Sequence, residues 1–293
     1  MIEPDDLARK LVEERDRARH DRDFELADRI RERLGSLGWV ALDAPDGTRL
    51  EALAERSEVP DGKPSQLQSP DRTDFSVILV LYGWPEDVRR MLSSLGRGRH
   101  QLEVIAVDIS EQGIPPRELG PRPPGVTVRV LRPTRRGGHA SALNAAIHQA
   151  WGRIVCLMEP SLEFGPNTLR ELDEALSDPQ VGLAGPFGLR NFDEHHFEPS
   201  EGGAADALEY LLAFRRRDAA RIGDIDRRFR YYRNFDLDFS YQVRATGLRI
   251  KLIEASGMVR HQHRLWESTP VAERDRLSRR NFNLWMDHWV RAK

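Results

Sequence analysis

The stretch FSVILVLYGWPEDVRRMLSSL, residues 75–95, decides the fold class. Residues 75–83 form a nearly continuous apolar run, which is typical of a strand buried on both faces. The following segment opens with Pro85 and two acidic residues, which favours the start of a helix. A buried strand that leads directly into a helix indicates one unit of a parallel α/β sheet.

The same alternation continues toward the C-terminus. Residues 139–151 carry small and apolar side chains at helical spacing. Further apolar runs predict buried strands at 102–108, 126–132 and 153–159. The sequence therefore predicts a mostly parallel sheet with helices on both faces, over about residues 74–265. Ligands of such sheets bind at the carboxyl ends of the strands, where Tyr82, Asp108 and Glu159 stand.

These segments, with residues 135–172 and 208–253, resemble in order and spacing the family 2 glycosyltransferases of the GT-A fold. The resemblance covers about two thirds of the chain. It implies a Rossmann-like domain that transfers a sugar from a nucleotide-diphosphate donor to an acceptor hydroxyl, with inversion at the sugar. It also implies a nucleotide-sugar donor as ligand and Mg²⁺ or Mn²⁺ as cofactor.

The resemblance assigns a donor site to several positions. Asp108 matches the aspartate that binds the nucleobase, and a carboxylate suits an N–H donor on the base. Tyr82 flanks the base in this interpretation, and Gly138 lets the backbone approach the nucleotide. Arg136 faces phosphate, and Asn144 belongs to the matching Ala-Leu-Asn helix. Two alternatives remain open, in which Asp108 caps a turn and Tyr82 is an ordinary core aromatic.

The metal motif departs from the family pattern. Where the family has Asp-x-Asp, this chain has Glu159-Pro160-Ser161, and a hydroxyl is a poorer ligand for a hard cation than a carboxylate. Either Glu163 or a downstream histidine compensates, or metal binding is weak. His261 and His263 form a His-x-His that we expect to project to one side of an extended segment. A pair of surface histidines is the alternative.

The catalytic base is expected in the segment Asn234-Phe235-Asp236-Leu237-Asp238. The resemblance places Asp236 at the base position and Asp238 at a further acidic position of the same motif. Phe235 stands where the family has glutamate. A base must lie within hydrogen-bond reach of the acceptor hydroxyl. The alternative interpretation makes Asp236 the N-cap of the following helix.

A separate module is predicted at residues 1–55. Residues 4–35 indicate two charged helices, with Asp21 or Asp23 as N-cap and Gly35 or Gly38 as C-cap, and 38–53 indicate a β-hairpin. The module resembles the C-terminal module of bacterial cysteinyl-tRNA synthetases, over residues 4–52. Acidic residues are interleaved with the arginines, so we expect protein docking or dimerisation rather than RNA contact.

The remaining segments are a linker and a C-terminal helix. Residues 56–73 contain three prolines and almost no large apolar side chains, which predicts a linker. Residues 266–293 predict an amphipathic helix that packs on the main domain or on a second subunit, with peripheral membrane contact as an alternative.

Composition limits the class of protein. The formal net charge is −2, which gives no general case for nucleic-acid binding. No apolar run is long enough to span a membrane, and the N-terminus lacks the apolar core of a secretory signal. Cys156 is the single cysteine, which fits a reducing cytoplasm. Two functions stay open: a cytoplasmic transferase, or a catalytically degenerate GT-A-like binding protein whose N-terminal module recruits a partner.

Overall fold

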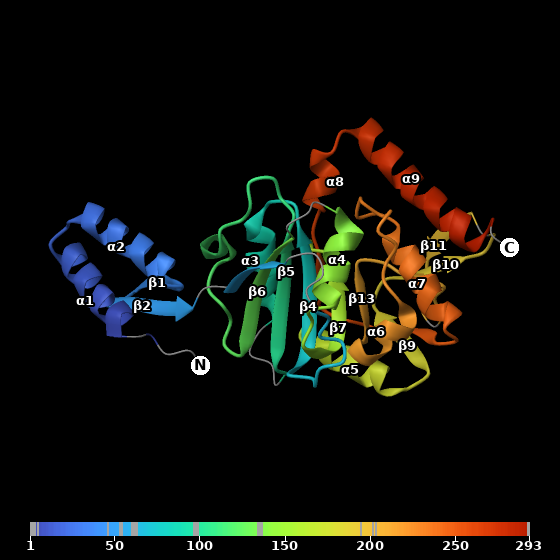
Figure 1. Ribbon diagram of the computed structural model, residues 1–293, viewed down its shortest axis with the longest axis horizontal. Coiled ribbons are helices and arrows are strands. Elements are labelled where there is room, and N and C mark those ends of the chain that lie inside the picture. Colours follow the sequence, from blue (N-terminus) through green and yellow to red (C-terminus); the bar gives the residue numbers. More distant parts are fainter. Residues whose placement is uncertain are drawn as a thin grey trace.

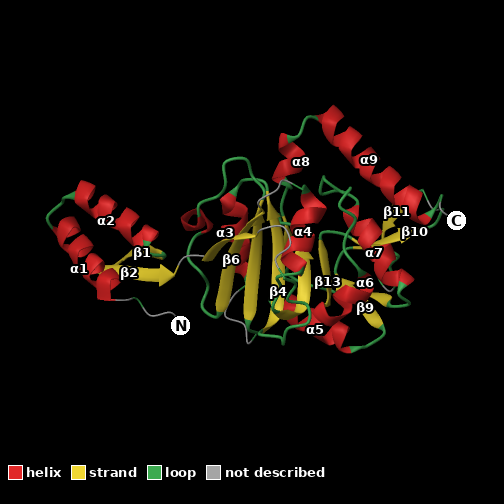
Figure 2. Cartoon of the chain, in the orientation of Figure 1, coloured by secondary structure: helices red, strands yellow, loops and turns green. Residues whose placement is uncertain are grey.

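The computed structural model describes residues 4, 6–45, 47–52, 55–59, 64–95, 100–133, 137–193, 195–200, 202 and 204–291. Figure 1 shows a small N-terminal module beside a larger α/β domain, and Figure 2 shows the sheet of that domain between helices. The α-helices are α1 (Asp6–His20), α2 (Phe24–Ser36), α3 (Pro85–Ser94), α4 (His139–Ile147), α5 (Thr168–Ser177), α6 (Ala219–Ile222), α7 (Phe235–Ala245), α8 (Arg264–Ser268) and α9 (Val271–Trp289). The strands of the main sheet are β3 (Glu55–Val59), β4 (Thr73–Leu81), β5 (Leu102–Asp108), β6 (Val126–Pro133), β7 (Gly152–Met158), β9 (Val181–Gly185), β13 (Leu211–Arg215) and β14 (Arg249–Leu252). The other strands are β1 (Trp39–Ala44), β2 (Gly47–Ala52), β8 (Leu162–Glu163), β10 (Gly188–Asn191), β11 (Phe197–Pro199), β12 (Ala207–Leu208) and β15 (Val259–Arg260).

The strand directions of the main sheet bring the predicted site residues to one edge. In the described part of the chain the strand order is β14-β9-β13-β7-β4-β5-β6-β3. Strands β4, β5, β6 and β7 pair in parallel, so their carboxyl ends lie side by side. Strand β13 runs antiparallel to β7, with Leu211 opposite Met158, so the residues just before β13 reach the same edge. The predicted α/β class, with a mostly parallel sheet, is confirmed.

Hydrophobic cores lie on both faces of this sheet, as the apolar strand runs predicted. On one face, β4 side chains such as Val77 and Leu79 pack with α3 and α5. On the other face, Ile78 and Val80 pack with α4 and α7. Because α4 and α7 share a core, the N-termini of both helices are held near the strand ends.

The N-terminal module has its own small core, formed by Ala8, Ile30, Leu34, Trp39 and Ala41. The two predicted helices and the predicted hairpin are confirmed, with β1 and β2 antiparallel. Asp23 is the N-cap of α2 and accepts a hydrogen bond from the Leu26 amide, at 3.0 Å. Gly38, with a φ of +87°, follows the end of α2. Such a left-handed residue is the usual way to end a helix.

A buried arginine ties the module together. Arg15 of α1 is 1% exposed and donates to the Asp43 carboxylate at 2.8 Å and to the Thr48 hydroxyl at 2.5 Å, thereby joining α1 to both strands of the hairpin. We expect Arg15→Ala to destabilise the module by about 1–3 kcal/mol, since it leaves these acceptors without their donor. Hydrogen exchange of the amides in residues 6–52 of the full chain should show the loss of protection.

The matched control for this prediction is Arg17→Ala, on the same helix. Arg17 pairs with Glu13 across one turn and both side chains are largely exposed, so we expect almost no change in protection. Equal protection in Arg15→Ala and Arg17→Ala would contradict the assigned role of Arg15.

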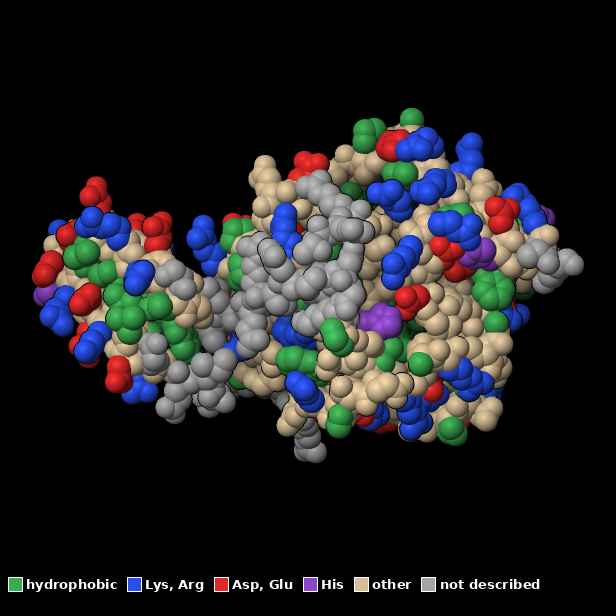
Figure 3. Space-filling view, in the orientation of Figure 1, with side chains coloured by type: hydrophobic (Ala, Val, Ile, Leu, Met, Phe, Trp, Pro, Cys, Tyr) green, Lys and Arg blue, Asp and Glu red, His purple; other side chains and the backbone are tan. Residues whose placement is uncertain are grey.

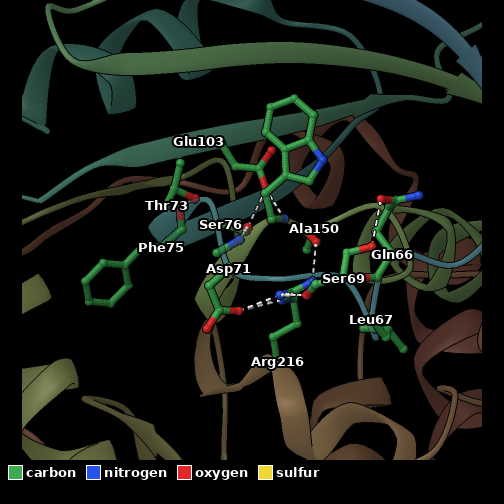
Figure 4. A network of polar contacts seen from close by, with 12 residues as sticks. Gln66, Leu67, Ser69, Asp71, Thr73, Phe75, Ser76, Glu103, Ala150 and Arg216 are labelled. Atoms are coloured by element: carbon green, nitrogen blue, oxygen red, sulfur yellow. Dashed lines mark hydrogen bonds and ion pairs between the residues drawn. The ribbon is translucent and has the colours of Figure 1, made fainter.

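The segment predicted as a linker, 56–73, is only partly one. Residues Glu55–Val59 form β3, which pairs in parallel with β6 at the edge of the main sheet. Residues 64–72 are held against the opposite end of the sheet by Arg216, which is 3% exposed (Figure 4). Its guanidinium donates to the carbonyl of Gln66 at 2.6 Å, to the carbonyl of Ser69 at 2.6 Å and to Asp71 at 2.5 Å. A low content of apolar side chains therefore did not exclude order here, because backbone carbonyls supply the contacts.

The C-terminal segment, predicted as one helix over 266–293, forms α8 and α9 with a break between Ser268 and Val271, and α9 packs on the main domain. Trp285 and Met286 of α9 are buried with Leu237 of α7 and Leu189 of β10. No helix in the described residues is long and apolar enough to cross a membrane.

Candidate functional site

A cavity at the carboxyl ends of β4 and β7 gathers four of the predicted site residues. Tyr82, Glu159, Asp236 and His263 line it together with His139, Tyr210 and Phe235. A second cavity, lined by Trp84 and Ser161, adjoins it through Tyr82 and His263. Two acidic residues far apart in the sequence therefore share one concave site, which is the usual form of a small-molecule site.

Asp236 occupies the first turn of α7. The N-cap of this helix is Asn234, so the alternative in which Asp236 is the N-cap does not hold. Burial and the nearby Glu209 carboxylate raise the pKa of Asp236 to about 7, against the effect of Arg233. A carboxyl that titrates near neutral pH is well matched to general-base work.

Glu159 stands directly after β7 and is oriented by Ser161. The Ser161 hydroxyl donates to Glu159 Oε2 at 3.1 Å, so Ser161 acts on the carboxylate that precedes it. Burial and the neighbouring Asp236 raise the pKa of Glu159 to about 8. Glu159 is therefore mostly protonated at neutral pH and carries little charge there.

Two charged residues that act on the carboxyl groups of the site escaped the sequence analysis. Glu209 precedes β13, and burial raises the pKa of its carboxyl. Arg233 precedes α7 and lowers the pKa values of Glu159, Asp236 and Glu209. Arg233 lies three residues before Asp236, so its place in the sequence could have indicated a role near the same site. No sequence pattern indicates that β13 returns antiparallel to β7 and brings Glu209 to this edge of the sheet.

The histidines of the cavity are neutral at physiological pH. Burial lowers the pKa of His139 to about 3 and that of His263 to about 4, and the charge of Arg233 adds to the effect on His263. His139 Nδ1 lies 2.7 Å from the Tyr82 hydroxyl. His263 stacks on Tyr232, with ring centroids 3.9 Å apart. Both rings therefore line the cavity as uncharged groups with restricted orientation.

Strained backbone gathers around the cavity. Trp84, Tyr210 and Asn234 have φ values of +54°, +64° and +66°, in the left-handed region that non-glycine residues rarely adopt. Each stands where the chain enters an element at the cavity, before α3, before β13 and before α7 respectively. Such strain concentrates at functional sites, where the surrounding structure holds it.

Asp108 lies at the predicted strand end, but other groups of the protein already donate hydrogen bonds to both of its carboxylate oxygens. Oδ1 accepts from the amide and hydroxyl of Ser110, at 3.0 and 2.6 Å. Oδ2 accepts from the Ile114 amide at 2.7 Å and from Arg132 at 2.9 Å. The structure thus shows the turn-capping role, and a nucleobase would have to displace one of these donors.

Two further predicted donor-site residues serve the fold instead. Asn144 is buried and exchanges two hydrogen bonds with the backbone of Ile225, at 2.7 and 3.0 Å, so its amide does not face the cavity. Gly138 has a φ of +86°, and a Cβ there would lie 2.8 Å from Cα of Arg230. Because Gly138 has no side chain, the backbone of Arg230 can approach it closely. Arg136 lies outside the described residues.

Asp238 and His261 also point away from the cavity. Asp238 Oδ1 accepts from His288 at 2.7 Å and from Trp289 at 2.8 Å, which anchors α9 to α7. His261 pairs with Glu163 at 2.5 Å. Of the two histidines of the His-x-His, only His263 lines the cavity.

The expected divalent cation does not find a preassembled set of ligands. Among the described residues, no three His, Cys, Asp or Glu side chains are grouped so as to hold a metal ion. Of the four expected ligands, Ser161 is hydrogen-bonded to Glu159 and His261 is paired with Glu163. Cations such as Mg²⁺ need several oxygen ligands, and the described residues do not supply them as a preassembled group.

The raised pKa of Glu159 has a consequence for stability. A carboxyl whose pKa is higher in the folded than in the unfolded protein binds its proton more tightly when folded. Its contribution is therefore present at low pH and is lost as the pH rises from about 4 through about 8. We expect Glu159→Gln to be more stable than the wild type at pH 8 to 9, with a smaller difference at pH 5. Urea denaturation at each pH measures this.

The control for that series is Glu198→Gln, at an exposed position on β11. It should leave the pH dependence of the free energy of unfolding unchanged. If the free energy of unfolding of Glu159→Gln had the same pH dependence as that of the wild type, the pKa of Glu159 would not be raised by burial.

Comparison with protein families gives one match for the main domain. The model of glycosyl transferase family 2 matches residues 76–240. This range contains Tyr82, Glu159, Asp236 and the backbone that connects them.

Solved structures with the same fold support this match. The mannosyltransferase PcManGT from Pyrobaculum calidifontis, in complex with GDP-Man and Mn²⁺, aligns over 70% of this chain and 63% of that chain, with 23% identity and a TM-score of 0.50. GalNAc-T7 with UDP, GalNAc and Mn²⁺ aligns over 74% of this chain and 48% of that chain, with 16% identity and a TM-score of 0.58. At these identities the likeness shows the GT-A fold.

The N-terminal module has different relatives. It is similar to cysteine–tRNA ligase 1 of Burkholderia lata, with 46% identity over 56 residues, 19% of this chain and 12% of the ligase. It is also similar to the ligase of Caldicellulosiruptor saccharolyticus, with 50% identity over 44 residues, 15% of this chain and 10% of the ligase. The chain thus spans only about a tenth of the length of these enzymes, so the similarity concerns this short segment alone.

Proposed function

Because the chain belongs to glycosyl transferase family 2, we propose that it transfers a sugar from a nucleoside-diphosphate sugar to an acceptor hydroxyl, with Asp236 as general base. The observation that supports this most is the shared cavity of Glu159 and Asp236 at the strand ends. It combines a carboxyl whose pKa is raised to about 7 with neutral and aromatic walls.

The proposed reaction is a single displacement. Asp236 takes the proton of the acceptor hydroxyl as its oxygen forms a bond to the anomeric carbon. The bond from that carbon to the diphosphate breaks at the same time, and its electron pair leaves with the nucleoside diphosphate. Attack opposite the leaving group inverts the anomeric carbon. Tyr82 and the neutral His139 would flank the donor on the other wall, where their hydrogen bond fixes both rings.

The proposed reaction assigns no step to a divalent cation, and the effect of a cation is tested separately. Mn²⁺ accompanies the donor or nucleotide in the two similar structures. In this chain Glu159 and His263 are the expected ligands that line the cavity, and a cation would also need oxygen ligands from the donor's own phosphates.

The test is release of nucleoside diphosphate from UDP-, GDP- and dTDP-sugars, measured with and without Mn²⁺ and with a panel of hydroxyl acceptors. We expect one donor class to be turned over, and NMR of the product to show the inverted anomeric configuration. Retention of configuration would remove Asp236 as a single-displacement base. Absence of release with every donor and acceptor would favour the second candidate function.

That second candidate is a binding protein without turnover, whose N-terminal module recruits a partner. The occupied oxygens of Asp108 favour it, because the expected contact to the base is already used. Leu7, Phe24 and Leu26 of the module are exposed large hydrophobic residues, and Figure 3 shows hydrophobic side chains among mixed charges on its surface. Such a surface suits a protein partner better than RNA. Nucleotide binding without hydrolysis or transfer would identify this function.

A further inference from the structure

We propose that a separate pocket, between α7, α9 and the end of β10, binds a neutral sugar residue of a glycan. Its lining includes Phe192 after β10, Tyr241 and Arg244 of α7, and Trp285 and Trp289 of α9. None of the described residues that line this α7–α9 pocket also lines the cavity of the proposed reaction. The inference therefore adds a second ligand site and does not depend on the proposed function.

The packing of α9 on α7 creates this pocket (Figure 1). Leu237, Tyr241 and Arg244 recur at helical spacing, so they share one face of α7. Leu237 is buried with Trp285 of α9, whereas the Arg244 side chain is 40% exposed. The two helices are thus in close contact at Leu237, and the pocket lies further along α7, at Tyr241 and Arg244.

Aromatic rings supply the apolar part of the wall. The Tyr241 ring centroid lies 5.2 Å from that of Trp285 and 5.8 Å from that of Trp289. Phe192 is 70% exposed at the rim. An exposed ring at a pocket gives a ligand a flat apolar surface on which to stack. The C–H face of a pyranose ring matches such a surface.

A charged pair supplies the polar part of the wall. Arg244 lies 3.3 Å from the Asp206 carboxylate, and its guanidinium lies 5.0 Å from the Tyr241 ring. The Asn191 amide donates to the same carboxylate at 3.0 Å, which helps to fix its position. A carboxylate accepts and a guanidinium donates several hydrogen bonds. This pair can therefore bind the hydroxyl groups at the edge of a sugar whose face lies on the rings.

The charges of the pocket favour a neutral ligand over a nucleotide. Asp206 and Arg244 are the only charged residues among the described lining, and they pair with each other. A phosphate group would bring its negative charge close to the Asp206 carboxylate, which is unfavourable. A pocket with aromatic walls and a few polar groups is the usual form of a small-molecule site, and a sugar fits it without added charge.

One polar atom of the wall has no partner. Trp285 is fully buried, and its Nε1 makes no hydrogen bond within the described structure. Buried N–H groups nearly always have an acceptor in native proteins. A hydroxyl oxygen of a bound sugar would provide an acceptor at this wall, which is an independent indication of a ligand here.

Tryptophan fluorescence provides the test, because Trp285 and Trp289 line the pocket. Maltotriose, cellotriose and chitotriose, which differ in linkage or N-acetylation, are titrated into the full chain and its variants. We expect at least one to bind the wild type with a Kd of roughly 10 µM to 1 mM. Phe192→Ala should weaken this binding about three- to tenfold through loss of the stacking surface. Arg244→Gln should weaken it about tenfold through loss of a charge-assisted hydrogen bond.

Phe24→Ala and Arg249→Gln are the matched controls. Phe24 is 59% exposed on the N-terminal module, and Arg249 is 66% exposed and pairs with Asp178 outside the pocket. Both variants should bind the sugar as the wild type does, and circular dichroism checks that each variant is folded. Asp236→Asn should also leave the affinity unchanged, as should saturating UDP, because the two sites share no lining residue.

Three results would overturn the inference. They are no binding of any of the three sugars, sugar binding that neither Phe192→Ala nor Arg244→Gln weakens, and sugar binding that UDP abolishes. If instead UDP or GDP binds and Phe192→Ala weakens that binding, the pocket takes a nucleotide and the assignment to a sugar is wrong. Each of these results leaves the proposed function standing, because transfer is tested separately through Asp236.

Discussion

Asp236→Asn should lower the rate of sugar transfer by about 10²- to 10⁴-fold, the range that a positioned general base contributes. The amide fills the same space at the start of α7 but cannot take the acceptor's proton. Donor binding should stay within a few-fold of the wild type, because the change leaves the other walls of the cavity in place. Initial rates of nucleoside-diphosphate release and a separate nucleotide titration measure the two effects.

The pH profile gives an independent check on this assignment. A base works when it is deprotonated, so wild-type kcat/KM should fall as the pH drops through about 7, the raised pKa of Asp236. The residual activity of Asp236→Asn should lack this step. Asp173→Asn on α5, an ion-pair partner of Arg153 outside the cavity, is the control and should keep both rate and profile. Full activity in Asp236→Asn would remove it as the base.

Glu103→Gln should lower the free energy of unfolding by about 3–5 kcal/mol, the cost of breaking a buried ion pair from one side. Glu103 is fully buried on β5 and pairs with Arg129 at 2.8 Å. It also accepts from the Ser76 hydroxyl at 2.5 Å (Figure 4). The Trp151 amide donates to the same carboxylate at 2.5 Å. The substitution leaves the charge of Arg129 buried without its counter-ion. It also replaces a carboxylate that accepts from Ser76 and Trp151 with an amide whose NH₂ group cannot accept a hydrogen bond.

The control for this effect is Glu174→Gln on α5. Glu174 pairs with Arg170 across one exposed helical turn, and such pairs contribute about 0.3–0.5 kcal/mol. Urea denaturation followed by tryptophan fluorescence should separate the two variants clearly. Similar midpoints for both would show that the Glu103 cluster does not hold β4, β5 and β6 together.

The fold was predictable because its signals are local. The apolar run at 75–83 and the acidic start of α3 are readable in isolation, and each implies a buried strand or a helix. The strand β3 was missed because its sequence, ERSEV, is mostly polar and shows no apolar strand pattern. Its pairing with β6 joins segments far apart in the sequence.

Residues of the site could be predicted from the sequence only where they match motifs of the family. Glu159 and Asp236 were expected together, and the structure places them in one cavity. The roles of Asp108, Asn144 and Asp238 depend on which donors the folded chain brings to them, and no sequence periodicity encodes this. Ser161 was interpreted as a weak metal ligand, whereas it orients the neighbouring Glu159 through a hydrogen bond.

The central claim is that the donor binds between Tyr82, Glu159 and Asp236 at the strand ends. A crystal structure of the chain with the nucleoside diphosphate that binds most tightly tests it directly. The account predicts the diphosphate in this cleft, with Asp236 facing the position of the sugar. A nucleotide bound elsewhere on the protein, with this cavity empty, would contradict it.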